Sequence, residues 1–220
     1  SQNPDMILNL LKSRRSNRLY KNENLNKDTL KKLKDMLKWV PTGCNSHSLH
    51  FSFIDDTEVM QEFRDYTNKK IVNALNTKGI KMIVDKFSPF LQHFANGEDI
   101  IFRGAPHFLV VANKVTASCP KEDAIIALSY FELYAQSLGV GTCWCGFGDI
   151  ALKAFPELLE YLKIPEGYKV EYTMLFGPKA ANYARTTQNE EVSIVSAEKK
   201  GVKKISFINK LKRLFWNKIR

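Results

Sequence analysis

The segment 106–113 (PHFLVVAN) restricts the fold of this chain more than any other feature of its sequence. Apolar residues follow one another there with almost no polar interruption, and such a short run suits a strand that is buried on both faces. A strand of this kind lies inside a sheet, with other elements packed above and below it. The sequence therefore predicts a layered fold built around this strand.

Other segments predict the elements that surround it. Strand patterns occur at 50–55 (HFSFID) and 168–177 (YKVEYTMLFG), and helical patterns occur at 57–76 and 122–138. The helix at 122–138 is apolar around much of its circumference, so we expect it to be buried in the core or against another subunit. Strands alternate with helices but are few, which indicates one α+β domain.

Two more helices are expected near the N-terminus. Asn3 and Pro4 suit the cap and the first position of a helix that runs to about Ser13. Asn26 can cap a second helix, which Pro41 stops. The apolar stripe by which this helix packs on the body consists of Leu30, Leu33, Met36, Leu37 and Val40.

Positive charge is concentrated at the C-terminal end. Of the 33 Lys and Arg residues, nine lie in 199–220, which contains no acidic residue. The other 24 nearly balance the 23 Asp and Glu, so the body is close to neutral although the formal net charge is +10. We therefore predict a domain at 1–198 and a basic arm at 199–220, with no nucleic-acid-binding surface on the body. No apolar run approaches the ~20 residues of a membrane-spanning helix.

The cysteines give no sign of a metal centre. Cys44, Cys119, Cys143 and Cys145 lack the paired C-x-x-C spacing of zinc ribbons and the run that binds iron–sulfur clusters. We expect no metal site and a reducing, cytoplasmic setting.

An arginine-rich segment follows the first helix, at 13–18 (SRRSNR). If the chain is extended there, Arg14, Ser16 and Arg18 project to one side. Two guanidinium groups and a hydroxyl then form an anion site suited to a phosphate. Taken alone, a segment of this kind is more often a solvated charge cluster than a phosphate site.

The loop at 41–50 (PTGCNSHSLH) connects a helix to a strand. Gly43 allows a ligand to approach the backbone, and Asn45 offers a donor and an acceptor together. The alternative is a loop that only connects and caps. His47 and His50 would suit a metal only on a helix, and the flanking sequence is not helical.

The segment 139–148 (GVGTCWCGFG) holds four glycines around a tryptophan. The G-x-G-x-x-G spacing of a dinucleotide-binding turn fails at Trp144, and the glycines follow a helix rather than a strand. We predict an irregular segment whose backbone amides are free to meet something flat. Cys143 and Cys145 are expected to be small apolar residues rather than a redox pair.

Together, these segments resemble the FMN-dependent nitroreductase family. The matching features follow in order: the R-R-S-x-R start at 14–18, the A/V-P-[ST]-x-x-N-S loop at 40–46, the strand entered through Gly104-Ala105-Pro106, the G-[LV]-G-[ST]-C-W pattern at 139–144, and the Gly-Pro-Lys at 177–179 with Arg185 beyond it.

The resemblance implies an α+β fold with a central, mostly antiparallel sheet flanked by helices, assembled as an intertwined homodimer with two FMN sites at the interface. The family's phosphate and ribityl contacts fall on Arg14, Arg15, Ser16 and Arg185, with Arg18 near the pyrimidine edge. The loop from the partner subunit falls on Pro41, Thr42, Gly43 and Asn45. The backbone that meets flavin N5 falls on Cys145, Gly146 and Phe147. The family's loop commonly continues N-S-Q-P-W, whereas this chain reads N-S-H-S-L at 45–49.

The function that the resemblance implies is that of an FMN-dependent oxidoreductase. The expected donor is NAD(P)H, and the expected acceptor is electron-poor, such as a nitroaromatic or a quinone. The flavin supplies the chemistry, so no catalytic side chain is required. Two alternatives stay open: a reductase fed by a ferredoxin-type partner or module, and a non-catalytic FMN-binding dimer.

The basic arm has an amphipathic pattern from 205 to 219, with apolar residues near helical spacing. Its apolar face could rest on the partner subunit or on an anionic membrane surface. We favour the partner subunit, because an exposed stripe of this size promotes aggregation unless it is covered.

Overall fold

The computed structural model describes residues 3–186 and 192–197. The chain divides into two compact units, 1–187 and 188–220. Among the described residues, all helices and strands belong to the first unit. The arm predicted at 199–220 lies outside the described residues, so the domain boundary and the helix in the arm stay predictions. No helix of the described part is long and apolar enough to cross a membrane.

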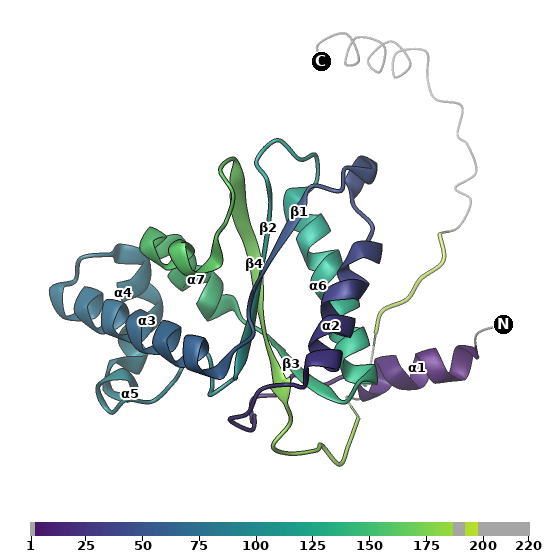
Figure 1. The fold of residues 1–220 in the computed structure, drawn as a ribbon, viewed down its shortest axis with the longest axis horizontal. Coiled ribbons are helices and arrows are strands. Elements are labelled where there is room, and N and C mark those ends of the chain that lie inside the picture. Colours follow the sequence, from purple (N-terminus) through teal and green to yellow (C-terminus); the bar gives the residue numbers. More distant parts are fainter. Residues whose placement is uncertain (1–2, 187–191, 198–220) are drawn as a thin grey trace, which may run out of the picture. The chain divides into compact units, whose positions relative to one another are not determined.

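A four-stranded antiparallel sheet forms the centre of the first unit (Figure 1). Its strands, in the spatial order β1-β2-β4-β3, are β1 (Leu49–Ile54), β2 (His107–Lys114), β4 (Tyr168–Pro178) and β3 (Val140–Trp144). Strand β2 is interior and is buried at every residue before Lys114. The prediction from the apolar run at 106–113 is therefore confirmed.

Helices cover both faces of the sheet. On one face lie α2 (Lys27–Met36) and α6 (Pro120–Ser137); on the other lie α3 (Thr57–Thr77), α4 (Lys81–Phe87), α5 (Leu91–Ala95) and α7 (Gly146–Ala154), as Figure 1 shows. Alternation along β2 creates two cores, because Phe108 and Val110 face the α3 side while Leu109 and Val111 face the α6 side. The expected α+β architecture is confirmed.

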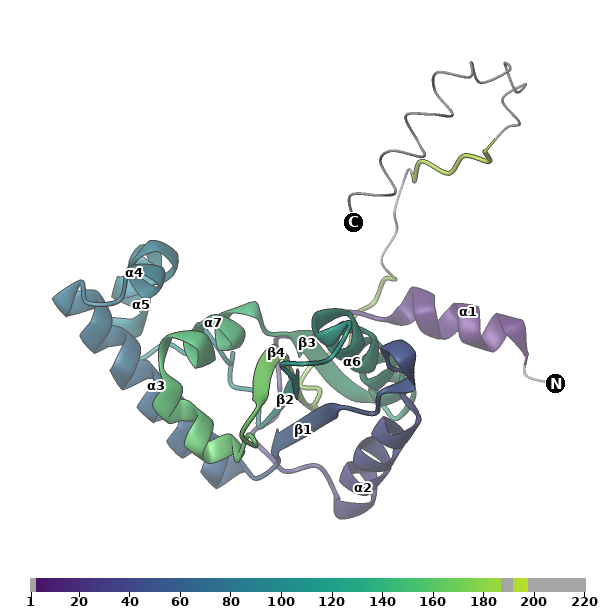
Figure 2. The ribbon, with the colours of Figure 1, turned by 90° about the horizontal axis from the view of Figure 1, so that it is seen from above.

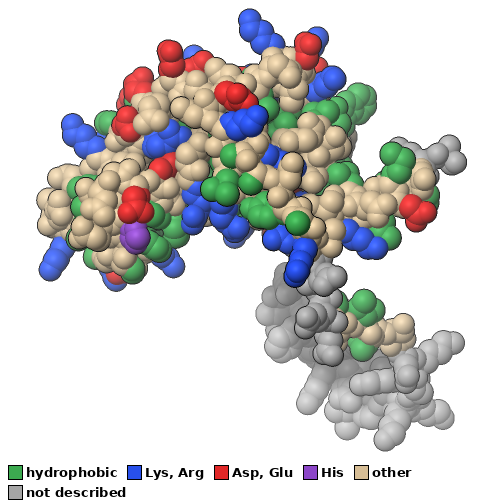
Figure 3. Space-filling view, turned by 90° about the horizontal axis from the view of Figure 1, so that it is seen from below, with side chains coloured by type: hydrophobic (Ala, Val, Ile, Leu, Met, Phe, Trp, Pro, Cys, Tyr) green, Lys and Arg blue, Asp and Glu red, His purple; other side chains and the backbone are tan. Residues whose placement is uncertain are grey.

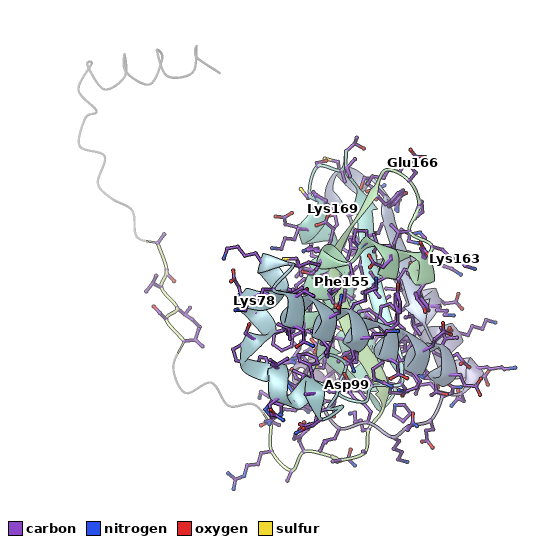
Figure 4. All side chains as sticks on the ribbon, turned by 90° about the vertical axis from the view of Figure 1, so that its left-hand side faces the viewer. Lys78, Asp99, Phe155, Lys163, Glu166 and Lys169 are labelled. Carbon is purple, nitrogen blue, oxygen red and sulfur yellow. The ribbon has the colours of Figure 1, made fainter. Side chains whose placement is uncertain are left out.

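Helix ends are set by local capping, as the sequence predicts. The Asn3 side chain accepts a hydrogen bond from the Asp5 N–H at 3.0 Å, and the Asn26 side chain accepts one from the Thr29 N–H at 2.7 Å. These bonds satisfy donors that have no partner within the helix. Helix α3 ends where Lys78, at the left in Figure 4, takes a left-handed conformation.

Helix α1 (Pro4–Ser13) forms as predicted, but none of its residues is buried. It contacts α6 and projects from the body of the first unit in Figure 2. Apolar side chains lie exposed along it, at the right in Figure 3; they include Met6, Ile7, Leu8 and Leu11. Within the described residues, nothing covers these apolar side chains of α1.

The prediction of an irregular segment at 139–148 is wrong. Residues Val140–Trp144 form the edge strand β3, and α7 begins at Gly146. The glycine at 141 serves close packing, because a Cβ there would lie 3.0 Å from the Asn17 Cβ and from the Lys179 Cγ. The strand was not predicted because two glycines in a short run are untypical of a strand, and its partner, β4, lies far along the chain.

Candidate functional site

A pocket of about 230 Å³ lies where β3 passes into α7. Its lining consists of Arg18, Ile101, Arg103, Cys143, Trp144, Cys145, Gly146, Phe147 and Leu175. The lining carries two guanidinium groups and no carboxylate, beside apolar and aromatic surface. We call it the β3–α7 pocket. It brings together four of the residues predicted from the sequence: Arg18, Cys145, Gly146 and Phe147.

The arginine segment runs beside β3 and reaches this pocket. The Asn17 N–H donates to the Thr142 carbonyl at 2.7 Å, and Ser16 pairs with Thr142 in a parallel bridge. The segment is thus extended at this point, as its side-chain pattern required. Arg18 lines the β3–α7 pocket.

Arg15 lies in a different place. Its guanidinium stacks on the Tyr183 ring, 4.7 Å from the centroid, and donates to the Arg185 carbonyl at 3.3 Å. A smaller hollow of about 150 Å³ lies there, lined in part by Arg15 and Lys179. The structure brings Arg15 and Arg185 together, but it does not place Arg15 in the β3–α7 pocket.

Arg14 is held by a buried carboxylate that the sequence analysis missed. The Arg14 guanidinium donates to Glu132 Oε1 at 3.1 Å, and the Trp144 indole N–H donates to Glu132 Oε2 at 3.1 Å. Glu132 is only 4% exposed, and a buried carboxylate is stable only when such partners neutralise it. The available signal was that Glu132 is the one charged residue between Ala124 and Ser137.

The N-terminus of α7 opens onto the pocket. The Cys145 thiol accepts from the Gly148 N–H at 3.3 Å, and the Cys145 backbone exchanges hydrogen bonds with Thr173. Gly146 and Phe147 belong to the first turn, whose N–H groups have no intrahelical acceptor and carry partial positive charge. The pocket therefore offers backbone N–H groups that can donate hydrogen bonds to an electron-rich atom of a ligand.

The two cysteines of the pocket are packing residues, as predicted. Both are buried, and all four cysteines of the chain are free thiols. Burial raises the pKa of Cys145 to about 12 and also raises the pKa of Cys143. Neither thiol forms a reactive thiolate near neutral pH.

Arg103 lines the β3–α7 pocket, and the sequence analysis did not identify it. It has a left-handed backbone (φ 50°), and Gly104 follows with φ 67°. Asp99, which Figure 4 labels below α3, holds this turn by accepting from the Phe102 N–H at 2.7 Å and the Gly104 N–H at 2.8 Å. Buried Arg64 in turn donates to Asp99 at 2.7 Å. A lone arginine in a loop carries no sequence signal for this placement.

The loop at 41–47 does not reach the β3–α7 pocket of its own chain. The Gly43 N–H donates to Asp123 Oδ1 at 2.7 Å, in the first turn of α6. Asp123 and Glu132 are nine residues apart on this helix, or about 14 Å along its axis. Pro41, Thr42, Gly43 and Asn45 therefore lie near the opposite end of α6 from Arg14. The described residues contain no group of side chains that could hold a metal ion.

Comparison with known proteins identifies the fold and the family. Residues 11–178 match the sequence profile described as "Nitroreductase family". No curated protein sequence matched the chain.

Several solved structures share the fold. A nitroreductase with bound FMN from Desulfitobacterium hafniense is 22% identical and has a TM-score of 0.69, over 89% of this chain and 100% of that one. An FMN-dependent nitroreductase from Clostridium difficile is 23% identical, with a TM-score of 0.64 over 89% and 100%. An FMN-dependent nitroreductase from Mycobacterium smegmatis in complex with NADPH is 16% identical, with a TM-score of 0.61 over 81% and 90%.

The structural likeness agrees with the profile match, which spans most of the chain. The chain belongs to the nitroreductase family, a family of FMN-dependent oxidoreductases.

Proposed function

We propose that this protein binds FMN and passes electrons from NAD(P)H to an electron-poor acceptor such as a nitroaromatic or a quinone. One observation carries the proposal: Arg18 and the first turn of α7 meet at a single pocket. The Mycobacterium smegmatis relative was solved with NADPH, which supports a nicotinamide donor. FMN, when bound, supplies the redox chemistry.

The residues of the pocket fit the flavin ring. Ile101, Phe147 and Leu175 offer apolar surface for a flat ring, and the Gly146 and Phe147 N–H groups can meet N5. Reduction places negative charge on the N1/C2-carbonyl edge, and Arg18 near that edge would stabilise it. These residues bind and orient the ring, and none of them needs to exchange a proton.

The phosphate contacts are proposed for Arg14, Ser16 and Arg185, with a supporting role for Arg15. Guanidinium groups make charge-assisted hydrogen bonds with a phosphate dianion. Arg14 is already oriented by Glu132, so its position is set before any ligand binds. Arg15 holds the Arg185 carbonyl, which ties the segment after β4 to the arginine segment.

We also propose a homodimer in which the 41–45 loop of each subunit covers the flavin of the other. The β3–α7 pocket of about 230 Å³ is smaller than the ~300–1,000 Å³ typical of such ligand sites. Because the loop and Arg14 lie toward opposite ends of α6, one chain does not bring them to one ligand. A second copy, related by two-fold symmetry, can do so.

The test begins with the absorption spectrum of the purified protein, which should show bound flavin. Anaerobic stopped-flow mixing with NADH and with NADPH should then bleach the flavin, and an added nitroaromatic should restore its colour. Bleaching by neither nucleotide would favour a ferredoxin-type donor. Retained FMN without turnover of any donor and acceptor would favour a non-catalytic binding dimer, and a colourless protein that does not take up FMN would contradict the proposal.

For the arm at 199–220, we propose docking on the partner subunit in preference to an anionic membrane. Truncation after residue 198 distinguishes docking on the partner subunit from binding to a membrane. A lower melting temperature with no effect on vesicle binding supports docking, whereas loss of salt-sensitive binding to anionic vesicles supports the membrane.

A further inference from the structure

We propose that Ser48, Asn113 and Asp123 are positioning residues that hold the loop 41–48 in the shape with which it covers the flavin. The inference rests on the function proposed above for that loop. It concerns residues outside the β3–α7 pocket, which would act on the flavin only through the loop. We call these three residues the loop anchor.

The loop has an unfavourable backbone that something must maintain. Cys44, Asn45 and His47 all have left-handed conformations, with φ of 54°, 52° and 48°. Non-glycine residues rarely adopt this region, and they persist there only where the surrounding structure imposes it. Three instances within four residues form a backbone that local preference does not favour, so contacts with the rest of the fold must help to hold it.

The loop anchor supplies those contacts at both ends of the loop. At the start, the Gly43 N–H donates to Asp123 Oδ1 at 2.7 Å. At the end, the Ser48 hydroxyl donates to Asn113 Oδ1 at 2.7 Å. Asn113 Nδ2 lies 3.4 Å from Asp123 Oδ2, which links the two attachments.

Burial makes these attachments strong. Asp123, Asn113 and Ser48 are 1%, 0% and 6% exposed, so water does not compete for their hydrogen bonds. Asp123 lies in the first turn of α6, Asn113 lies in β2, and Ser48 is the loop residue directly before β1. The loop is therefore fixed to the scaffold at two points while its tip stays at the surface.

Close packing also restrains the backbone at Gly43. A Cβ at this position would lie 3.1 Å from the Cys119 Cβ and Sγ, so the loop backbone lies directly against the N-terminus of α6. Within the loop, the His47 N–H donates to the Thr42 hydroxyl at 3.0 Å and fastens the turn. In the family's common loop pattern a proline stands where this chain has Ser48. Here, a buried hydroxyl supplies the restraint that a proline ring would supply by its fixed φ.

The first experiment compares Ser48→Ala with Ser52→Ala. Both serines are 6% exposed, and both hydroxyls donate to a buried acceptor, but Ser52 bonds to the Leu162 carbonyl away from the loop. The rate of FMN release from the holoprotein is followed by the fluorescence of free flavin after dilution. We expect Ser48→Ala to release FMN about 3- to 10-fold faster than the parent, and Ser52→Ala to match the parent.

The second experiment compares Asp123→Asn with Glu122→Gln. Each change removes one negative charge from the first turn of α6, but Glu122 is exposed and has no bond to the loop. Asn at 123 keeps the shape of the side chain but weakens the acceptor of the Gly43 N–H. We expect FMN release to be about 10- to 100-fold faster in Asp123→Asn and unchanged in Glu122→Gln.

The melting temperature of each variant separates positioning from general destabilisation. The inference holds if the anchor variants release FMN faster than their controls at equal losses of melting temperature. It is overturned if each anchor variant and its control release FMN at the same rate, while the parent retains its flavin. A parent protein that holds no flavin would instead contradict the proposed function. Failure of the inference and failure of the proposed function therefore give different results.

Discussion

At the scale of the residue, buried polar side chains connect segments that lie far apart in the chain. His107 is fully buried at the start of β2, and its Nε2 accepts a hydrogen bond from the Leu25 N–H at 3.0 Å. Burial lowers its pKa to about 4, and this effect outweighs the opposing influence of Asp55 and Asp56. His107 is therefore neutral in the folded protein, where it ties the segment before α2 to the sheet.

This burial predicts a loss of stability in mild acid. Between pH 6.5 and about 4, the unfolded chain binds a proton at this histidine while the folded protein does not, so stability falls as the pH falls. From pH 7 to pH 5, the expected loss is on the order of 1–2 kcal/mol. Urea unfolding at both pH values measures it, and His107→Gln should remove that increment. An equal loss in the variant would contradict the assignment to His107.

At the scale of the element, close contacts between strands limit which residues fit. Gly177 in β4 lies opposite the start of β2, where a Cβ would be 2.5 Å from the Pro106 Cγ and 2.6 Å from its Cδ. The proline ring cannot rotate away from such a contact. The Gly-Pro pattern that the sequence suggested as part of a ligand region thus also has a packing role.

We expect Gly177→Ala to lower the free energy of unfolding by about 2–3 kcal/mol, because one strand must shift to admit the methyl group. Gly79→Ala is the control, since the only atom near its Cβ is the side-chain oxygen of Thr77. Urea unfolding of the two variants measures the difference. Equal stability would show that the β2–β4 contact relaxes at no cost.

At the scale of the whole molecule, exposed apolar surface indicates where a second copy would bind. Helix α6 buries one side in the core but leaves Ile126 and Tyr130 at the surface, at 38% and 49% exposure. Helix α1 contacts α6, and among the described residues none covers the apolar side chains of α1. Together these faces support the proposed homodimer, because such surface is usually covered in a stable assembly.

The proposed dimer predicts that a charge placed on the exposed side of α6 separates the subunits. Tyr130→Glu should shift the protein toward monomer in sedimentation velocity and should release FMN, because a buried unpaired carboxylate is costly at an interface. Val59→Glu, on the other layer of the fold at α3, should leave the dimer intact. A flavin-loaded monomer of the parent protein would refute the dimer.

Local patterns in the sequence were sufficient for helices α1, α2, α3 and α6 and for strands β1, β2 and β4. The apolar run of β2 and the caps Asn3 and Asn26 act within a few residues, so they could be read without knowledge of the fold. The arginine segment was identified in the same way, by the two-residue period of an extended chain. The family resemblance depended on the order of such short segments.

Only the tertiary structure decided how the site is held together. Arg14 meets Glu132 across 118 positions of the chain, and Gly43 meets Asp123 across 80. Strand β3 was missed because its pairing with β4, rather than its own residues, makes it a strand. Each of these features is a hydrogen bond or a close contact between distant segments, and its energy depends on burial that exists only once the chain has folded.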